Sequence, residues 1–185
     1  PTRSRRAQAA GCRGATTQPR AYRGASQTAT VPCLVTEHGP IDESLDIMKW
    51  ALARNDPDGW CDMPAEGHDW IARADGPFKD ALDRTKYATR YPDEDTEAQR
   101  AKASAFLQDL DAQLDDWIFD RPTLADFAIL PFVRQFAFID RDWFDAQDWP
   151  QLRRWLDRFL NSPRFESIMQ KYPQWQPDDA PVPFP

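Results

Sequence analysis

The chain has 185 residues, of which 41% are hydrophobic and 29% charged, values typical of one or two globular domains. No apolar run approaches the ~18 residues of a membrane helix, and no apolar segment typical of a secretory signal follows the first arginines, so we expect no membrane partner. The net charge of −7 disfavours nucleic acid as a partner, because phosphate binding needs clustered Lys and Arg.

Residues 1–25 form an irregular basic segment that we expect to be disordered or divergent. Residues 1–30 contain six arginines and no acid. They also contain few large aliphatic side chains, so they cannot bury enough apolar surface to offset the loss of chain entropy on folding. The alternative is that this basic arm binds an anionic partner.

The three cysteines, Cys12, Cys33 and Cys61, are an odd number without a Cys-x-x-Cys pair. This pattern does not predict a disulfide framework, and it favours a reducing, cytoplasmic location. Cys61 and His68 share a loop with acidic residues, but two ligands do not make a zinc site. We therefore predict that the chain binds no metal.

Order is predicted to begin near Ser26. Residues 31–36 are a strand candidate in which Pro32 belongs at the start or at an edge, because proline lacks a backbone donor. "EHGP", residues 37–40, has the composition of a turn. Ile41-Asp42 is predicted to return as a second, very short strand, which gives a hairpin.

A helix is predicted to follow the hairpin directly. Leu45, Met48 and Leu52 recur at helical spacing, and Ser44 stands where an N-cap residue would stand. "NDPDG", residues 55–59, ends this helix. We place the boundary between two domains at about residues 56–68.

The remainder of the chain has helical periodicity throughout. The pattern predicts helices over residues 69–87 (with a bend at Gly76-Pro77), 96–117, 150–160 and 163–171. The helix over 96–117 has one apolar stripe, made of Ala103, Phe106, Leu107, Leu110 and Leu114.

"RPTLADFAILPFVRQFAFI" predicts one further helix. Thr123 and Asp126 have the spacing of a capping box, and we assign both to folding rather than to binding. The apolar run that follows predicts a helix buried all round, with a kink at Pro131. Phe138, near its end, is expected in the core.

These segments together resemble the glutathione transferases. "ATVPCLV…IDESLDIM" resembles the glutathione-binding half of their thioredoxin-like domain, and "RPTLADFAILPFVRQFA" looks like the central helix of their C-terminal domain. The closing segment, residues 149–175, is similar to bacterial members. The resemblance covers residues 26–185. It implies an α/β plus all-α fold, with a partial thioredoxin-like glutathione-binding domain over 26–57 and an all-helical C-terminal domain over 68–185.

The resemblance also implies a role for four residues. Pro32 would follow a cis peptide bond, and the Val31 backbone would pair with the cysteinyl part of glutathione as an added strand does. Glu43 would face the free amine of the γ-glutamyl group. Ser44, at a helix N-terminus, would hold the γ-glutamyl carboxylate. Gln27 or Thr28 would lie near the glycyl end.

The catalytic residue stays unknown at this stage. Family members have a Cys, Ser or Tyr in an earlier loop, and Cys12 is followed by Arg13 and Gly14 rather than by proline and an aromatic residue. The sequence thus resembles a family member with an N-terminal deficit. The function implied is a cytoplasmic, homodimeric, glutathione-binding protein. If intact, it transfers glutathione as co-substrate to a small electrophile or exchanges thiol and disulfide. The alternative is a non-catalytic interaction module.

Overall fold

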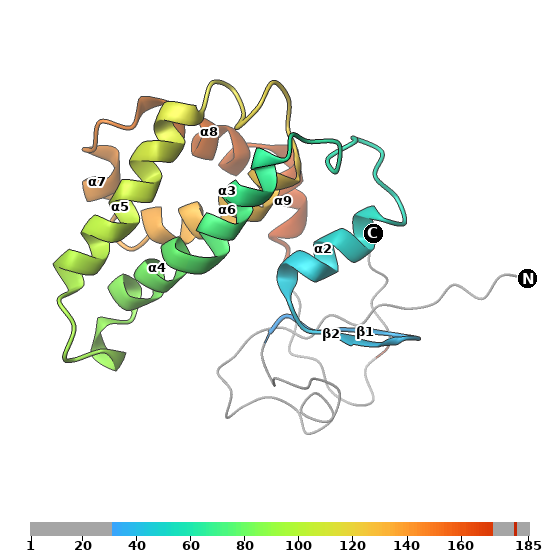
Figure 1. The fold of residues 1–185 in the computed structure, drawn as a ribbon, viewed down its shortest axis with the longest axis horizontal. Coiled ribbons are helices and arrows are strands. Elements are labelled where there is room, and N and C mark those ends of the chain that lie inside the picture. Colours follow the sequence, from blue (N-terminus) through green and yellow to red (C-terminus); the bar gives the residue numbers. More distant parts are fainter. Residues whose placement is uncertain (1–30, 172–179, 181–185) are drawn as a thin grey trace, which may run out of the picture. The chain divides into compact units, whose positions relative to one another are not determined.

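A computed structural model describes residues 31–171 and residue 180 of the chain. These residues fall into two compact units (Figure 1). The hairpin unit contains residues 31–56, 170, 171 and 180, and the helical unit contains residues 57–169. The basic segment 1–25, with Cys12, and the candidates Gln27 and Thr28 lie outside the described residues.

The hairpin unit begins with two short antiparallel strands, β1 (Leu34–Thr36) and β2 (Gly39–Ile41). Gly39 has a φ of 115°, which explains why glycine stands at this tight reversal. The Thr36 hydroxyl donates a 2.8 Å hydrogen bond to the Gly39 carbonyl and closes the turn. The predicted first strand, 31–36, was too long, and the second strand begins inside the predicted turn.

Helix α2 (Ser44–Leu52) follows the hairpin after two residues. The N-cap residue is Glu43, with an extended backbone, and Ser44 is the first helical residue. The prediction of Ser44 as the N-cap was therefore wrong by one position. The cause is local: nothing in the sequence distinguishes a serine at the N-cap from one at the next position, and Glu43 supplies the extended backbone that an N-cap needs.

The helical unit begins with an almost continuous helical segment, as predicted for residues 69–87. It consists of α3 (Glu66–Arg73), the single π-helical turn η1 (Ala74–Phe78) and α4 (Lys79–Lys86). The π-helical turn contains Gly76 and Pro77, where the sequence predicted a bend. Pro77 is exposed, so its missing N–H and its ring disturb the solvent side of the helix.

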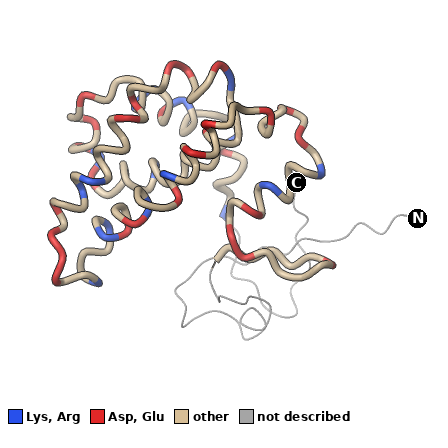
Figure 2. Tube along the Cα trace, viewed as in Figure 1, with Lys and Arg blue, Asp and Glu red and all other residues tan. Residues whose placement is uncertain are grey.

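A short 3₁₀ turn, η2 (Ala88–Arg90), precedes the long helix α5 (Thr96–Gln113). The Asp95 carboxylate caps α5 by accepting from the N–H groups of Glu97 and Ala98. Acidic residues are grouped at the turn before α5 (Figure 2). The predicted apolar stripe is buried: Ala103, Phe106, Leu107, Leu110 and Leu114 are all at most 6% exposed. The helix ends at Gln113, before the predicted Trp117, because Leu114 is extended.

Helix α6 (Leu124–Ala137) contacts α3, α4 and α8 and supplies many of the core side chains. It is not buried all round, as the apolar run had predicted, because Pro131 is exposed. The helix continues through Pro131 without a break. Phe138, expected in the core, is 56% exposed at the end of the helix. Its ring lies near the guanidinium groups of Arg134 and Arg141, which explains how an exposed aromatic side chain is accommodated.

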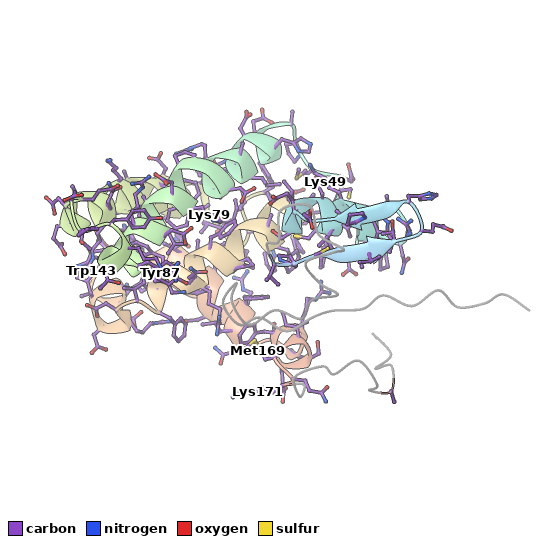
Figure 3. The ribbon with its side chains drawn as sticks, turned by 90° about the horizontal axis from the view of Figure 1, so that it is seen from below. Lys49, Lys79, Tyr87, Trp143, Met169 and Lys171 are labelled. Carbon is purple, nitrogen blue, oxygen red and sulfur yellow. The ribbon has the colours of Figure 1, made fainter. Side chains whose placement is uncertain are left out.

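Three shorter helices complete the unit: α7 (Arg141–Asp145), α8 (Pro150–Leu160) and α9 (Pro163–Ile168). The sequence predicted α8 with its first-turn proline, and it predicted α9 somewhat too long. It missed α7, which is too short to show a helical period. Met169, just after α9, is 47% exposed and is labelled in Figure 3. None of the helices in the described ranges is long and apolar enough to cross a membrane.

Candidate functional site

The open end of the β1–β2 hairpin brings the predicted binding residues close together. Leu34 is paired with Ile41, so the residues before β1 and after β2 leave the hairpin at the same end. Cys33 and Asp42 interact across this end through their side chains. Val31-Pro32 and Glu43-Ser44 therefore lie within two residues of one cross-strand pair. We call these four residues the hairpin-end site.

The N-terminus of α2 is the part of this site that suits an anion. Within the described part of the chain, no side chain caps this helix. The first intrahelical bond runs from the Ile47 N–H to the Glu43 carbonyl at 3.0 Å, which leaves the N–H groups of Ser44, Leu45 and Asp46 without intrahelical acceptors. Glu43 and Ser44 are both exposed. A ligand carboxylate could accept from these N–H groups, and Glu43 could pair with a ligand amine.

The Val31–Pro32 peptide bond is cis, as the sequence resemblance implied. Pro32 is exposed and Val31 is half-buried. Val31 lies outside the β1–β2 ladder, so its backbone groups take no part in that pairing. A peptide-like ligand lying antiparallel to Val31 would add a short strand there.

Cys33 is the thiol closest in sequence to the hairpin-end site, and its environment makes it unreactive. Its side chain is buried, 9% exposed. Burial raises the pKa of Cys33 to about 11, and a hydrogen bond and charge repulsion from Asp42 act in the same direction. The thiol is therefore protonated at neutral pH and is not a nucleophile. The sequence analysis missed this pair: both residues stand inside the predicted strands, and it is the hairpin register that brings them together.

Cys61 and His68 do not share a loop, as the sequence had suggested, because His68 lies in α3; both side chains are exposed. Among the residues that the structure describes, no group of three or more His, Cys, Asp or Glu side chains is arranged to hold a metal ion. The hairpin-end site itself contributes one carboxylate, Glu43, which is too few donors for a metal centre.

Thr123 and Asp126 form the capping box of α6, inside the core of the helical unit. Asp126 is fully buried and its carboxylate accepts four hydrogen bonds. The donors are the Thr123 N–H (2.9 Å) and hydroxyl (3.0 Å), the Ile118 N–H (3.1 Å) and the Trp155 indole N–H (3.0 Å). Burial raises the pKa of Asp126, and these donors oppose the rise. No ligand group is needed to explain this residue.

The helical unit also matches a known family. Residues 93–158, which include α5, α6, α7 and most of α8, match the model of the glutathione S-transferase C-terminal domain. Over 54 residues the chain is 39% identical to the glutathione S-transferase aclG of Aspergillus oryzae. This part of the chain is similar to the C-terminal domain of the glutathione S-transferases.

Solved structures agree with this fold along most of the chain. A glutathione S-transferase from Rhodospirillum rubrum F11 superposes with a TM-score of 0.67 at 19% identity, covering 94% of this chain and 82% of that one. One from Methylobacterium radiotolerans, solved in complex with glutathione sulfonate, superposes with a TM-score of 0.61 at 20% identity, covering 91% and 84%. These similarities support the predicted class, an α/β plus all-α fold with a partial thioredoxin-like part and a helical C-terminal domain.

The similarity to the curated relative is confined to a segment. It spans 29% of this chain and 24% of the aclG protein. The chain thus covers about a quarter of that relative's length, and the solved structures show the fold alone.

Proposed function

We propose that this transferase-fold protein binds glutathione at the hairpin-end site, with the γ-glutamyl group at the N-terminus of α2. The observation that carries the proposal is the exposed start of α2 at Glu43 and Ser44, which no side chain of the described residues caps. The γ-glutamyl group has one carboxylate and one ammonium group on the same carbon. The N–H groups at Ser44 and the Ser44 hydroxyl suit the carboxylate, and the Glu43 carboxylate suits the ammonium.

The rest of the tripeptide would extend along Val31. Its cysteinyl N–H and C=O would pair with the backbone of Val31, while the exposed Pro32 borders the same strip. Two kinds of interaction would thus fix the ligand: charge pairing at one end and main-chain pairing in the middle.

The chemistry we propose for the bound ligand is thiol transfer. The glutathione thiol loses its proton, and its sulfur attacks the electrophilic carbon of a small substrate with loss of a leaving group, or attacks one sulfur of a disulfide and releases the other as thiolate. The residue that lowers the thiol pKa is not assigned, and Cys33 is unsuited because its own pKa is raised to about 11.

A non-catalytic interaction module is the second candidate, and the same observation on Cys33 favours it. In the described part of the hairpin unit, no thiol with a lowered pKa accompanies the site. The two candidates differ in turnover and agree in glutathione binding.

Calorimetric titration of the full chain with glutathione tests the binding. We expect Glu43→Ala and Ser44→Ala each to weaken binding about tenfold, because each removes one contact to a charged ligand group. The matched control is Asp46→Ala, which removes a carboxylate from the same first turn of α2 and should leave the affinity nearly unchanged. Equal affinities for all three variants and the unaltered chain would exclude the site.

Turnover is then measured with an aryl chloride and with a small disulfide as second substrates. Glutathione consumption that depends on Glu43 supports the transferase or reductase. Binding without consumption supports the interaction module.

We propose further that the protein is a homodimer in a reducing, cytoplasmic compartment. Three apolar side chains of the helical unit are strongly exposed: Phe138 (56%), Ile168 (64%) and Met169 (47%). Cys33 of the hairpin unit is a free thiol, which suits a reducing compartment. Sedimentation equilibrium at micromolar concentration should give twice the chain mass of 21.3 kDa; a single-chain mass would exclude the dimer.

A further inference from the structure

An open hollow of about 650 Å³ lies in the helical unit where α7 meets the first turns of α8. Arg141 and Asp145 of α7 line it, together with Pro150, Arg153, Arg154 and Asp157 of α8. The hollow is wide and open to solvent, so it has room for more than a single ion. All of its lining belongs to the helical unit, and the glutathione proposal does not use it.

The charges in the hollow are not balanced. Arg141 donates to the Asp145 carboxylate at 2.8 Å and to the Asp157 carboxylate at 3.0 Å, so two carboxylates share one guanidinium. Arg153 donates to the Asp145 backbone carbonyl at 2.6 Å, and Arg154 donates to the Gln151 side chain. Neither Arg153 nor Arg154 forms a salt bridge with a carboxylate of the described residues.

Arg153 is also held in place with donor capacity left over. Its bond to the Asp145 carbonyl, near the end of α7, fixes the guanidinium against that helix. Its Nε is buried and has no hydrogen-bond partner among the described atoms. Arg153 lines the hollow, so its guanidinium is placed to donate to an oxyanion there. Arg154 is exposed and can approach the same anion from the solvent side.

We propose that this hollow binds a small phosphate-bearing molecule with hydroxyl groups, of the size of a sugar phosphate. The phosphate is held by the forked donors of Arg153 and Arg154, which suit the geometry of phosphate oxygens. Asp145 and Asp157 accept hydrogen bonds from the hydroxyl groups, while Arg141 keeps both carboxylates in position.

A phospholipid headgroup would present the same phosphate chemistry. The soluble ligand is the better match because the chain has a net charge of −7, which opposes binding to an anionic bilayer. The test therefore includes both sources.

Glucose 6-phosphate and inorganic phosphate are the probes, titrated into the full chain at low ionic strength and followed by calorimetry. We expect glucose 6-phosphate to bind more tightly than inorganic phosphate, and Arg154→Gln to weaken its binding about tenfold. Arg154 is suited to the test because it is exposed and, within the described part of the chain, donates its side-chain hydrogen bond to Gln151 on the same helix, so the fold should tolerate the change.

Arg90→Gln is the matched control. Arg90 is exposed, lies in η2 and does not line the hollow, so the variant removes the same charge elsewhere. Equal weakening by Arg90→Gln and Arg154→Gln would mean that only the overall charge matters, and it would overturn the proposal. Absence of binding to either probe at 10-millimolar concentration, on the order of weak metabolite affinities, would also overturn it.

Vesicles of phosphatidylcholine and phosphatidylserine form the second arm. If the protein sediments with these vesicles and does not bind glucose 6-phosphate, the hollow binds a membrane surface instead of a soluble ligand, and the proposal is overturned. Binding of glucose 6-phosphate that is lost in Arg154→Gln, without sedimentation, is the expected result.

Discussion

The indole Nε1 of Trp155 donates a 3.0 Å hydrogen bond to Oδ1 of Asp126, and the two side chains are 1% and 0% exposed. The same oxygen accepts from the Ile118 N–H, while Oδ2 accepts from Thr123. One carboxylate thus joins the start of α6, the segment before it and the middle of α8. Since all four partners are donors, the ionised carboxylate is the form that satisfies them.

We predict that Asp126→Ala lowers the free energy of unfolding of the helical unit by more than about 3 kcal/mol. The change leaves several buried donors without an acceptor, and each costs about 1–3 kcal/mol. Urea denaturation followed by tryptophan fluorescence measures the loss. The control is Asp142→Ala on α7, an exposed carboxylate that should change stability by less than about 0.5 kcal/mol. Similar losses in the two variants would contradict the assigned role of Asp126.

The sequence predicted correctly those features that depend on residues within one short segment. The stripe from Ala103 to Leu114 was predicted because a long surface helix buries one face with a clear period. The spacing of Thr123 and Asp126 likewise predicts a box that involves only four consecutive residues. In both cases the pattern and the structure belong to the same short segment.

The sequence predictions were wrong where the burial of a residue depends on neighbouring elements of the fold. The apolar run of α6 predicted burial on every side, but Pro131 is exposed, and so is Phe138 beside Arg134. An apolar run does not say which of its residues a neighbouring helix covers. For the candidate site, the sequence predicted the local order of residues from Val31 to Ser44. It could not predict that Cys33 and Asp42 meet, because that depends on the hairpin register.

The second prediction concerns the ionisation of Cys33. We expect its alkylation by iodoacetamide to rise with pH around a midpoint near the pKa of about 11, because only the thiolate reacts. Asp42→Asn should lower this midpoint, since the carboxylate contributes to the raised pKa. Mass spectrometry of the Cys33 peptide gives the rate, and the exposed Cys61 serves as an internal control that should react faster at neutral pH. Equal rates for the two thiols at pH 7 would contradict the buried position of Cys33.

The same shift gives a third prediction, on stability. In the unfolded chain Cys33 ionises near its ordinary pKa of 9.0, whereas in the folded chain it ionises near 11. Between these values the folded state binds the extra proton, so raising the pH favours unfolding. The contribution of Cys33 is fully present below pH 9 and is lost as the pH rises through the folded pKa. Thermal unfolding of the hairpin unit, followed by circular dichroism, should show a loss that Cys33→Ser reduces.

A fourth prediction contrasts two glycines. Gly59 has a φ of 66°, and a Cβ there would lie 3.3 Å from Nη1 of Arg121, which itself donates to the Gly59 carbonyl. Gly59→Ala should therefore destabilise the helical unit by about 1–2 kcal/mol. Gly76→Ala should act in the opposite direction, by about 0.5–1 kcal/mol, because the added methyl meets no atom within 4 Å in a helical segment. Urea denaturation of both variants checks the signs, and a shared sign would contradict this account.

The last prediction concerns Pro131 in α6. The ring removes the N–H that would bond to the Phe127 carbonyl, yet the helix continues from Leu124 to Ala137. Pro131 is exposed, so Pro131→Ala loses little buried apolar surface and restores a backbone donor. We expect the variant to be more stable by about 1–3 kcal/mol, measured as a higher urea midpoint at an unchanged slope. The control is Pro163→Ala, at the first turn of α9, where proline removes no intrahelical bond and the change should be close to zero. A lower midpoint for Pro131→Ala would mean that the local backbone of α6 depends on the proline ring, and that the helix around it has adapted to the missing donor.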